Sequence, residues 1–516
     1  MAGRFVFPRG AVATPHYLAS AVGAATLERG GNAIDAVIAA NLTLGVVAPY
    51  FCGYGGDIFA IVWDGALTGY LGSGRSPSGA TADAVRSRSV DGHMAVFGPD
   101  SVTVPGAIAG WFDLLERWGT RSFGDLAQDA IRLARDGFEI TPGGAIAIAE
   151  ARRMYRDFPA WQATYGDAIE GSVLRQPALA GTIELLASEG PDAYYRGPIA
   201  DDIAATLQAL GGDLATSDLA AHAGEWTEPM RASYRDVEIA ELPPPTQGVT
   251  PLEAMRILDG FALPPPGVDR EHLLIEALKQ ALADRDQWVT DAAHMPHPAS
   301  ALLEDRWISA RRAAIDPARA VQPNAGVPQE GGTAYLCAAD ADGLLVSLIQ
   351  SNFVHFGSGV HVSERGINLN NRGFSFSLDP SRPNVYAPSK RPMHTLIPAM
   401  VLRDGRPALV FGSMGGDAQA AVHIQVLAHI VDGGMHPADA IAAPRWRVDV
   451  GSWQVHAENR FDPTLLAELR ARGHDVVDAR GGPYDKGMGH AHAIWPTTGG
   501  YGVTFDPRSE GAALGA

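Results

Sequence analysis

The residues Gly331-Gly332-Thr333-Ala334-Tyr335-Leu336-Cys337-Ala338-Ala339 carry the strongest structural signal in this chain. They follow a segment rich in proline, glycine and asparagine, residues 321–330, whose composition breaks periodic structure. Turn residues 340–343 and a second apolar run, residues 344–349, come next, so the pattern predicts a β-hairpin with Thr333 at its leading edge. Cleavage after Gly332 would give Thr333 a free α-amine, and an adjacent amine is the base that its hydroxyl needs to act as a nucleophile.

A simpler interpretation is that Thr333 is an ordinary strand residue after a flexible loop. Threonine is enriched in β-strands for steric reasons, and the residues before Thr333 favour this interpretation when they are taken alone. The choice between the two therefore depends on the rest of the sequence.

A series of short motifs, most of them rich in glycine, follows along the chain. They occupy residues 27–36 with 46–57, then 103–111, 134–138, 195–197, 356–360, 370–371, 390–392 and 412–416. In this order, and over nearly the whole chain, they resemble the γ-glutamyltranspeptidase family of N-terminal-nucleophile (Ntn) hydrolases. The resemblance reverses the interpretation of Thr333, which we expect to be the catalytic nucleophile.

Helical and strand patterns alternate along the chain, which predicts an α+β protein. The resemblance implies a four-layer αββα sandwich formed by two chains after self-cleavage. Thr333 would attack the carbonyl of Gly332 and leave a large subunit, residues 1–332, and a small subunit, residues 333–516, that stay associated in one globular unit. Two glycines at the cut tolerate strained backbone and close approach by the hydroxyl. The sequence leaves the oligomeric state open, and a dimer of these two-subunit units is one possibility.

Three further catalytic residues are implied by the resemblance. Ser351 falls where the family has a hydroxyl residue that hydrogen-bonds the N-terminal threonine. Gly415 and Gly416 match the glycines whose backbone N–H groups form the oxyanion hole. They also precede a helical pattern, and the N-terminus of a helix is itself suited to an oxyanion.

The substrate site departs from the γ-glutamyl pattern. The family's carboxylate-binding arginine falls on Ser73, its amine-binding aspartate on Ser375, and its serine pair on His394 and Thr395. A buried ammonium without a carboxylate partner costs several kcal/mol, so efficient use of γ-glutamyl amino acids becomes doubtful.

Two arginines offer a different substrate chemistry. Arg75 and Arg372 would suit a small carboxylate that lacks an α-amine, as in relatives that hydrolyse oxamate or other simple amides. Arg372 is equally compatible with a surface loop. Asn352 matches the family's substrate-contacting asparagine only if one residue is inserted before Phe356, so its role stays open.

Composition and the placement of cysteine and histidine bear on partners, localisation and metal binding. The chain has 516 residues and a formal net charge of −18, which argues against nucleic acid or an anionic membrane surface as a partner. Its N-terminus lacks the apolar segment of a secretory signal, and we expect a cytoplasmic protein. The cysteines Cys52 and Cys337 lie too far apart for a CxxC motif, and the histidine pairs 294/297 and 490/492 are weak metal candidates. We expect neither a metal nor a cofactor.

Local patterns predict several elements. Residues 15–29 should form a helix capped by Thr14, residues 33–44 a helix capped by Asn32, and residues 59–63 a strand. Further helices are expected at residues 125–135, 199–210, 270–288, 417–431 and 463–472.

The sequence therefore predicts an autoprocessed threonine amidohydrolase that cleaves a γ-glutamyl or related small acidic amide through an acyl-enzyme. One alternative is an oxamate-type hydrolase without γ-glutamyl specificity. Another is a catalytically silent scaffold or binding protein, which stays open because Tyr335 replaces a histidine of the family.

Overall fold

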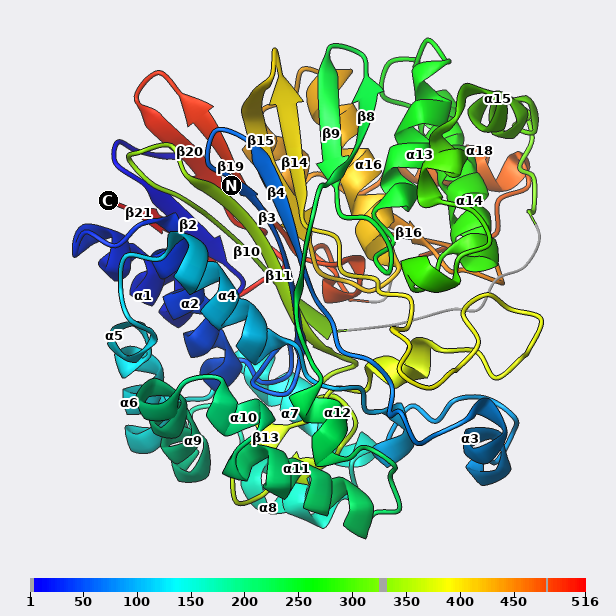
Figure 1. Ribbon diagram of the computed structural model, residues 1–516. Coiled ribbons are helices and arrows are strands. Elements are labelled where there is room, and N and C mark those ends of the chain that lie inside the picture. Colours follow the sequence, from blue (N-terminus) through cyan, green and yellow to red (C-terminus); the bar gives the residue numbers. More distant parts are fainter. Residues whose placement is uncertain (1–3, 324–331, 479–480) are drawn as a thin grey trace.

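The computed structural model describes residues 4–323, 332–478 and 481–516 (Figure 1). Two seven-stranded sheets lie at its centre. The first sheet contains, from edge to edge, β1 (Phe5–Phe7), β20 (Gly500–Thr504), β19 (Ala491–Thr497), β15 (Arg406–Ser413), β14 (Ala399–Arg403), β9 (Val237–Glu241) and β8 (Met230–Tyr234). The second contains β21 (Ala512–Gly515), β2 (Ala11–Thr14), β10 (Gly332–Ala339), β11 (Leu345–Phe353), β3 (Asp57–Trp63), β4 (Leu67–Gly72) and β7 (Glu225–Thr227).

Helices cover the outer face of each sheet (Figure 1). The first sheet packs against α13 (Val249–Asp259) and α16 (Ala418–Val431), beside which α14 (Val268–Trp288) lies. The second packs against α1 (Tyr17–Glu28), α2 (Ala33–Val47) and α4 (Ala107–Trp118). The order helix, sheet, sheet, helix confirms the α+β class and the four-layer αββα sandwich.

The remaining elements extend these layers or form a helical lobe beside them. Those in the first half of the chain are α3 (Ala82–Arg88), α5 (Phe123–Leu126), α6 (Gln128–Asp136), β5 (Phe138–Glu139), α7 (Pro142–Met154), α8 (Pro159–Tyr165), β6 (Val173–Leu174), α9 (Pro177–Glu189), α10 (Asp192–Tyr195), α11 (Pro198–Ala209) and α12 (Thr216–Ala220). Those in the second half are α15 (Asp305–Ala313), β12 (His361–Val362), β13 (Ile367–Asn368), α17 (Pro437–Ala442), β16 (Trp446–Val448), β17 (Val455–Ala457), α18 (Pro463–Ala471) and β18 (Val476–Asp478). Short 3₁₀ turns complete the set at Pro99–Ser101, Ala292–His294, Ala299–Leu303, Arg372–Ser375 and Lys486–Met488.

The layer between the sheets is a hydrophobic core built from alternate residues of the facing strands. Tyr335 and Cys337 of β10, Ile349 of β11, and Met400 and Val410 of the opposite sheet are all buried in one cluster. Successive side chains of a strand point to opposite faces, so the residues between these positions face the helices instead. Tyr335, Cys337 and Ala339 of β10 therefore face the layer between the sheets, and Thr333 faces it as well, because its hydroxyl hydrogen-bonds Ser351 of β11.

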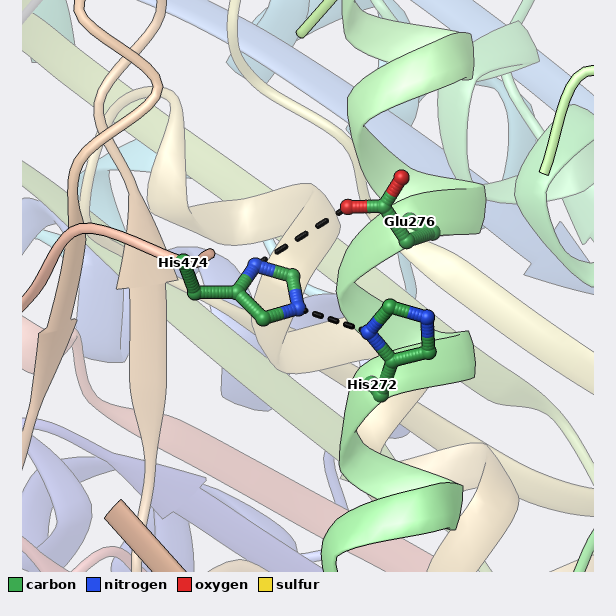
Figure 2. Close-up of side chains that lie close together, drawn as sticks. All are labelled: His272, Glu276 and His474. Atoms are coloured by element: carbon green, nitrogen blue, oxygen red, sulfur yellow. Dashed lines mark hydrogen bonds and ion pairs between the residues drawn. The ribbon is translucent and has the colours of Figure 1, made fainter. Parts of the chain in front are cut away.

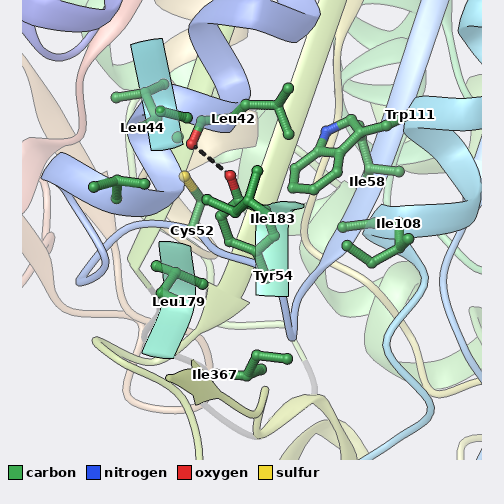
Figure 3. Close-up of a cluster of buried hydrophobic side chains, with 14 of the residues drawn as sticks. Leu42, Leu44, Cys52, Tyr54, Ile58, Ile108, Trp111, Leu179, Ile183 and Ile367 are labelled. Carbon is green, nitrogen blue, oxygen red and sulfur yellow. Dashed lines mark hydrogen bonds between the residues drawn. The ribbon is translucent and has the colours of Figure 1, made fainter. Parts of the chain in front are cut away.

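The second core lies between the second sheet and its helices, and Figure 3 shows part of it. Trp111 of α4 is completely buried there, and its Nε1 donates to Asn41 Oδ1 over 2.7 Å. The Asn41 amide in turn donates to Gln350 Oε1 over 3.2 Å, which ties α2 to β11. Tyr54 packs edge-on against Trp111 and donates its hydroxyl to Leu42 O. These buried polar contacts fix how the helix layer lies on the sheet.

Most of the predicted elements are present. The hairpin that begins at Thr333 is β10 and β11, and Asn32 caps α2 in a capping box with Asp35, as predicted. Thr14 as the cap of α1 is wrong. His16 occupies that position and accepts from Leu18 N, because Thr14 lies in β2. The helix predicted at residues 125–135 is broken into α5 and α6 at Ala127.

Two further expectations concern the loop before Thr333 and membrane-spanning segments. Most of the predicted loop before Thr333, residues 324–331 and with them Gly331, lies outside the described residues. Among the described residues, none of the helices combines the length and the apolar character needed to cross a membrane.

Asn41→Leu should destabilise the fold, because it leaves the buried Trp111 N–H without an acceptor and Gln350 without a donor. We expect a loss of about 2 kcal/mol in the free energy of unfolding, seen as a lower thermal midpoint. The matched control is Gln208→Leu on the exposed face of α11, which should leave the midpoint nearly unchanged. Equal midpoints for the two variants would contradict this account.

Candidate functional site

Thr333 is completely buried near the start of β10, where that strand faces the other sheet. Its Oγ1 donates to Ser351 Oγ over 3.3 Å, and the same Ser351 oxygen accepts from Phe353 N over 2.7 Å. The ladder between β10 and β11 shifts register between Gly332 and Ala334. A bulge of this kind re-aims a side chain, and here it lies at the residue whose hydroxyl must be positioned.

The chain that leaves β11 is strained. Phe353 has φ 82° and His355 has φ 48°, values that lie in the left-handed region and are uncommon for residues other than glycine. The guanidinium of Arg372 lies over the Phe353 ring, 3.8 Å from its centre. Such strain persists only where surrounding contacts hold it, and it clusters at functional sites.

Gly415 and Gly416 follow β15 and precede α16, with φ values of 129° and 58°. Met414 N donates to His490 O over 2.8 Å, but neither glycine donates its backbone N–H to an acceptor within the described part of the chain. Two adjacent free N–H groups before a helix are what an oxyanion hole requires.

A buried ion pair holds Gly489, the residue that packs against this glycine turn. Arg445 donates to Gly489 O over 2.8 Å and pairs with Asp506 at 2.8 Å. Gly489 packs directly on the turn: a Cβ added to Gly489 would lie 2.2 Å from Met414 O. Any side chain at position 489 would therefore collide with the glycine turn and displace it.

Four polar side chains gather in the same part of the molecule. Arg372 Nη1 donates to Thr395 Oγ1 over 3.4 Å, and His394 Nε2 lies 3.0 Å from Asp57 Oδ2. All four are buried, and Asp57 lies directly opposite Ser351 in the register of β3 and β11. Arg372 Nε and Nη2 have no hydrogen-bond partner among the described residues. Buried guanidinium donors without acceptors are costly, so they point to a ligand.

Burial controls the charge of this cluster. Burial raises the pKa of Asp57 to about 7, against the opposing effect of Arg372 and of hydrogen bonds from Gly74 and Gly106. Burial, helped by Arg372, lowers the pKa of His394 well below its usual value, so this imidazole is neutral. Burial also lowers the pKa of Arg372, which nevertheless remains charged at neutral pH. The charge of the site thus changes near pH 7 through Asp57.

Three of the residues predicted from the sequence lie elsewhere. Arg75 is half exposed and pairs with Asp291 at 3.0 Å, and no hydrogen bond among the described residues joins it to Thr333 or Arg372. Asn352 faces away from the layer between the sheets, against Gly53 and Gly56. Ser375 lines a separate cavity of about 100 Å³. We leave these three out of the site; any role of theirs in substrate binding stays a prediction.

Asp57 and Gln247 belong to the site in the structure, although their sequence patterns predicted no role for them. Gln247 donates its amide to Thr395 O over 2.9 Å and to Gly416 O over 3.3 Å, and so connects the polar cluster with the glycine turn. Asp57 was visible in the sequence as the last residue of a glycine-rich motif, directly before an apolar strand pattern, and that position was the available signal. Gln247 carried no signal of its own, because its contacts join segments far apart in the sequence.

His272, Glu276 and His474 come together outside this site, and Figure 2 shows them. His272 Nε2 lies 2.8 Å from Asp316 O, a carbonyl that can only accept, so His272 Nδ1 accepts from His474 Nε2 over 2.8 Å. The Lys279 ammonium donates to Glu276 Oε1 over 3.1 Å and lies 3.3 Å from His474 Nδ1. Hydrogen bonds thus occupy the atoms that a metal would need, and the group is a buried polar network.

A buried threonine at the head of a central strand, in a four-layer αββα sandwich, is the arrangement of an Ntn hydrolase. Ser351 and the glycine turn add the hydroxyl partner and the backbone donors that acyl transfer uses.

Comparisons with known proteins agree with this class. The family model of Gamma-glutamyltranspeptidase matches residues 19–516. The chain is 35% identical to the glutathione hydrolase-like YwrD proenzyme of Bacillus subtilis, over 98% of each chain, and 36% identical to the oxamate amidohydrolase proenzyme of Klebsiella pneumoniae, over 99% of each. The crystal structure of cephalosporin acylase from Bacillus halodurans superposes with a TM-score of 0.95, at 35% identity, covering 100% of this chain and 97% of that one. The chain belongs to the γ-glutamyltranspeptidase family of Ntn hydrolases, and it is an amidohydrolase that acts on C–N amide bonds.

Gly489→Ala should reduce amidohydrolase activity by tenfold or more, because the added methyl would displace the glycine turn through Met414 O. Gly434→Ala is the matched control: Gly434 also has a positive φ, 61° against 77° for Gly489, but has open space around its Cβ position. Steady-state rates and thermal midpoints are measured for both variants. Backbone strain should lower the thermal midpoint of both, whereas displacement of the turn should lower the rate of Gly489→Ala alone. Equal loss of activity in the two variants would contradict a role for residue 489.

Proposed function

We propose that this protein is an autoprocessed threonine amidohydrolase that cleaves the amide of a small acidic acyl group. The acyl group carries a carboxylate that Arg372 binds, and catalysis passes through an acyl-enzyme on Thr333. The single observation that supports this proposal best is the completely buried Arg372, whose Nε and Nη2 lack partners among the described residues, in one cluster with Thr395 and Asp57. A carboxylate fits such a fork of donors in two parallel hydrogen bonds.

Maturation begins with Thr333 Oγ1, which attacks the carbonyl carbon of Gly332. The new C–O bond replaces the C–N bond, the nitrogen takes up a proton as the α-amine of Thr333, and water then hydrolyses the ester. This reaction divides the chain into residues 1–332 and 333–516. Ser351 Oγ accepts the hydrogen bond that orients the attacking hydroxyl.

Catalysis uses the same hydroxyl again. The α-amine of Thr333 takes the proton, Oγ1 attacks the substrate carbonyl, and the N–H groups of Gly415 and Gly416 stabilise the oxyanion. The amine leaves with a proton, and water attacks the resulting ester. Gln247 holds the glycine turn in place relative to Thr395, so carboxylate binding and oxyanion stabilisation are aligned.

An acyl group without an α-amine suits the cluster better than γ-glutamate. Asp57 is its one acidic side chain, and its oxygens already meet His394 Nε2 and the N–H groups of Gly74 and Gly106. The names of the relatives support both possibilities, because they include an oxamate amidohydrolase and several glutathione hydrolases.

Tyr335 does not disturb this reaction scheme. Its hydroxyl hydrogen-bonds Ser347 Oγ at 2.8 Å, and its ring stacks on His492. Tyr335 therefore fills the core between the sheets, and its presence does not favour a silent scaffold.

Maturation can be tested by the intact mass of the purified protein. We expect the 54.4 kDa chain to give two fragments, the smaller of roughly 19 kDa and beginning at Thr333. Thr333→Ala should stay uncut, because it removes the attacking oxygen. Thr333→Ser is the conservative control and should still be cut. Uncut protein in the wild type would rule out the mechanism.

The acyl group can be identified by supplying oxamate, succinamate, glutathione and γ-glutamyl anilide to the mature enzyme. We expect the monoamides that lack an α-amine to have the higher kcat/KM. Preference for the γ-glutamyl compounds would contradict the assignment of Arg372 and Asp57.

The KM for such an acidic amide should rise as the pH passes upward through about 7. Below that pH Asp57 is protonated and leaves the Arg372 charge available; above it the ionised Asp57 competes for Arg372 and repels the substrate carboxylate. In Asp57→Asn the rise should be absent. A KM that stays flat in the wild type, or the same rise in both proteins, would exclude Asp57 as its cause.

A further inference from the structure

A cavity of about 750 Å³ is lined by residues that adjoin the proposed catalytic segments in sequence. Val354 and His355 line it and come directly after Phe353, which pairs with Gly332. Met414 lines it as well and comes directly before the glycine turn. The cavity thus adjoins both the end of β11, which pairs with the start of the Thr333 strand, and the residue before the glycine turn. It is large enough for a group much bigger than ammonia.

The walls of this cavity are largely apolar. Tyr50 and Phe51 lie edge to face at 4.5 Å, and Phe51 lies edge to face with His490 as well. Ile146 and Met154, both on α7, line the cavity, with exposed fractions of 54% and 39%. Large apolar side chains left in contact with water around a concave site are typical of a binding surface.

Charged groups at the cavity are mainly acidic. Among the described residues, Glu150, Glu510 and Asp485 line it, against one cation, Lys486. Glu510 is held in place by hydrogen bonds from Thr141 Oγ1 and Gly143 N. Acidic side chains outnumber the basic one in this described lining, so an anionic group is disfavoured in the cavity.

His490 adds a polar position to this apolar wall. Its side chain is 3% exposed, and neither ring nitrogen has a hydrogen-bond partner among the described residues. Burial lowers the pKa of His490 to about 3, so the ring is neutral and offers one donor and one acceptor.

We propose that this cavity binds the amine half of the substrate, and that this half carries an aromatic or other large apolar group which is neutral or cationic. The inference rests on the proposed function and extends it from the acyl group to the leaving amine. An acidic acyl group would bind at Arg372, the scissile carbonyl at Thr333, and the apolar amine between α7 and the loop of residues 481–487.

The test compares two secondary amides with the same acidic acyl group, an N-benzyl amide and an N-methyl amide. Their leaving amines are both alkylamines, so the difference between them is mainly the ring. We expect kcat/KM for the N-benzyl amide to be on the order of tenfold higher. A cationic aminomethyl group on the ring should keep this preference, and a carboxylate at the same place should reduce it.

Ile146→Ser tests the cavity wall directly. It should reduce the preference for the N-benzyl amide about threefold, since the ring loses an apolar contact. The matched control is Leu210→Ser, at the end of α11, because Leu210 is similarly exposed at 51% and does not line the cavity. This control should keep the preference of the wild type.

Binding provides a second readout that does not depend on turnover. Benzylamine should bind the protein more tightly than methylamine in calorimetry, and Ile146→Ser should weaken the binding of benzylamine. Equal kcat/KM for the two amides, or a preference that Ile146→Ser leaves intact, overturns the inference while the proposed function stands. If no acidic amide is hydrolysed, the acyl assignment fails, and the absence of benzylamine binding would then overturn the inference as well.

Discussion

The antiparallel pairing of β10 with β11 is the constraint on which the rest of this structure depends. Side chains alternate along a strand, so the register of this pair decides which residues enter the layer between the sheets. Thr333, Tyr335 and Cys337 enter it from β10, and Ile349 and Ser351 from β11. A slip of one residue would turn the hydroxyl of Thr333 towards the helices and bring an alanine into its place.

Burial between the sheets also limits which charged groups can be part of the site. The side chains between the sheets are buried, and a charge is tolerated there only with compensation. Arg372, Asp57 and His394 meet this condition as one unit, because Arg372 opposes the burial-induced rise in the pKa of Asp57 and helps burial to keep His394 neutral. The same low polarity strengthens any hydrogen bond that a ligand makes with the unpaired donors of Arg372.

Much of the fold could be predicted from the sequence, because its signals are local. Glycine-rich turns, the Asn32 cap and the alternating pattern after Thr333 each depend on a few neighbouring residues. The site could be predicted only in part. Counting along the chain placed the family's arginine on Ser73, and Arg75 was chosen because it lies two residues further on; in the structure Arg75 pairs with Asp291, 216 positions away. Gln247 acts through segments that meet only after folding, and a single sequence carries no record of such contacts.

The cut proposed after Gly332 would pass through an interleaved structure. In the first sheet, four strands from residues 399–504 lie between β1 on one side and β9 and β8 on the other; in the second, β2 lies between β21 and β10. The two products would therefore share both sheets, and neither could leave without unpairing several ladders. A single precursor chain lets these strands find one another as an intramolecular process, with a low entropic cost. The order of events is thereby fixed: the molecule must be assembled before it is divided, and separately produced halves would be poor substitutes for the precursor.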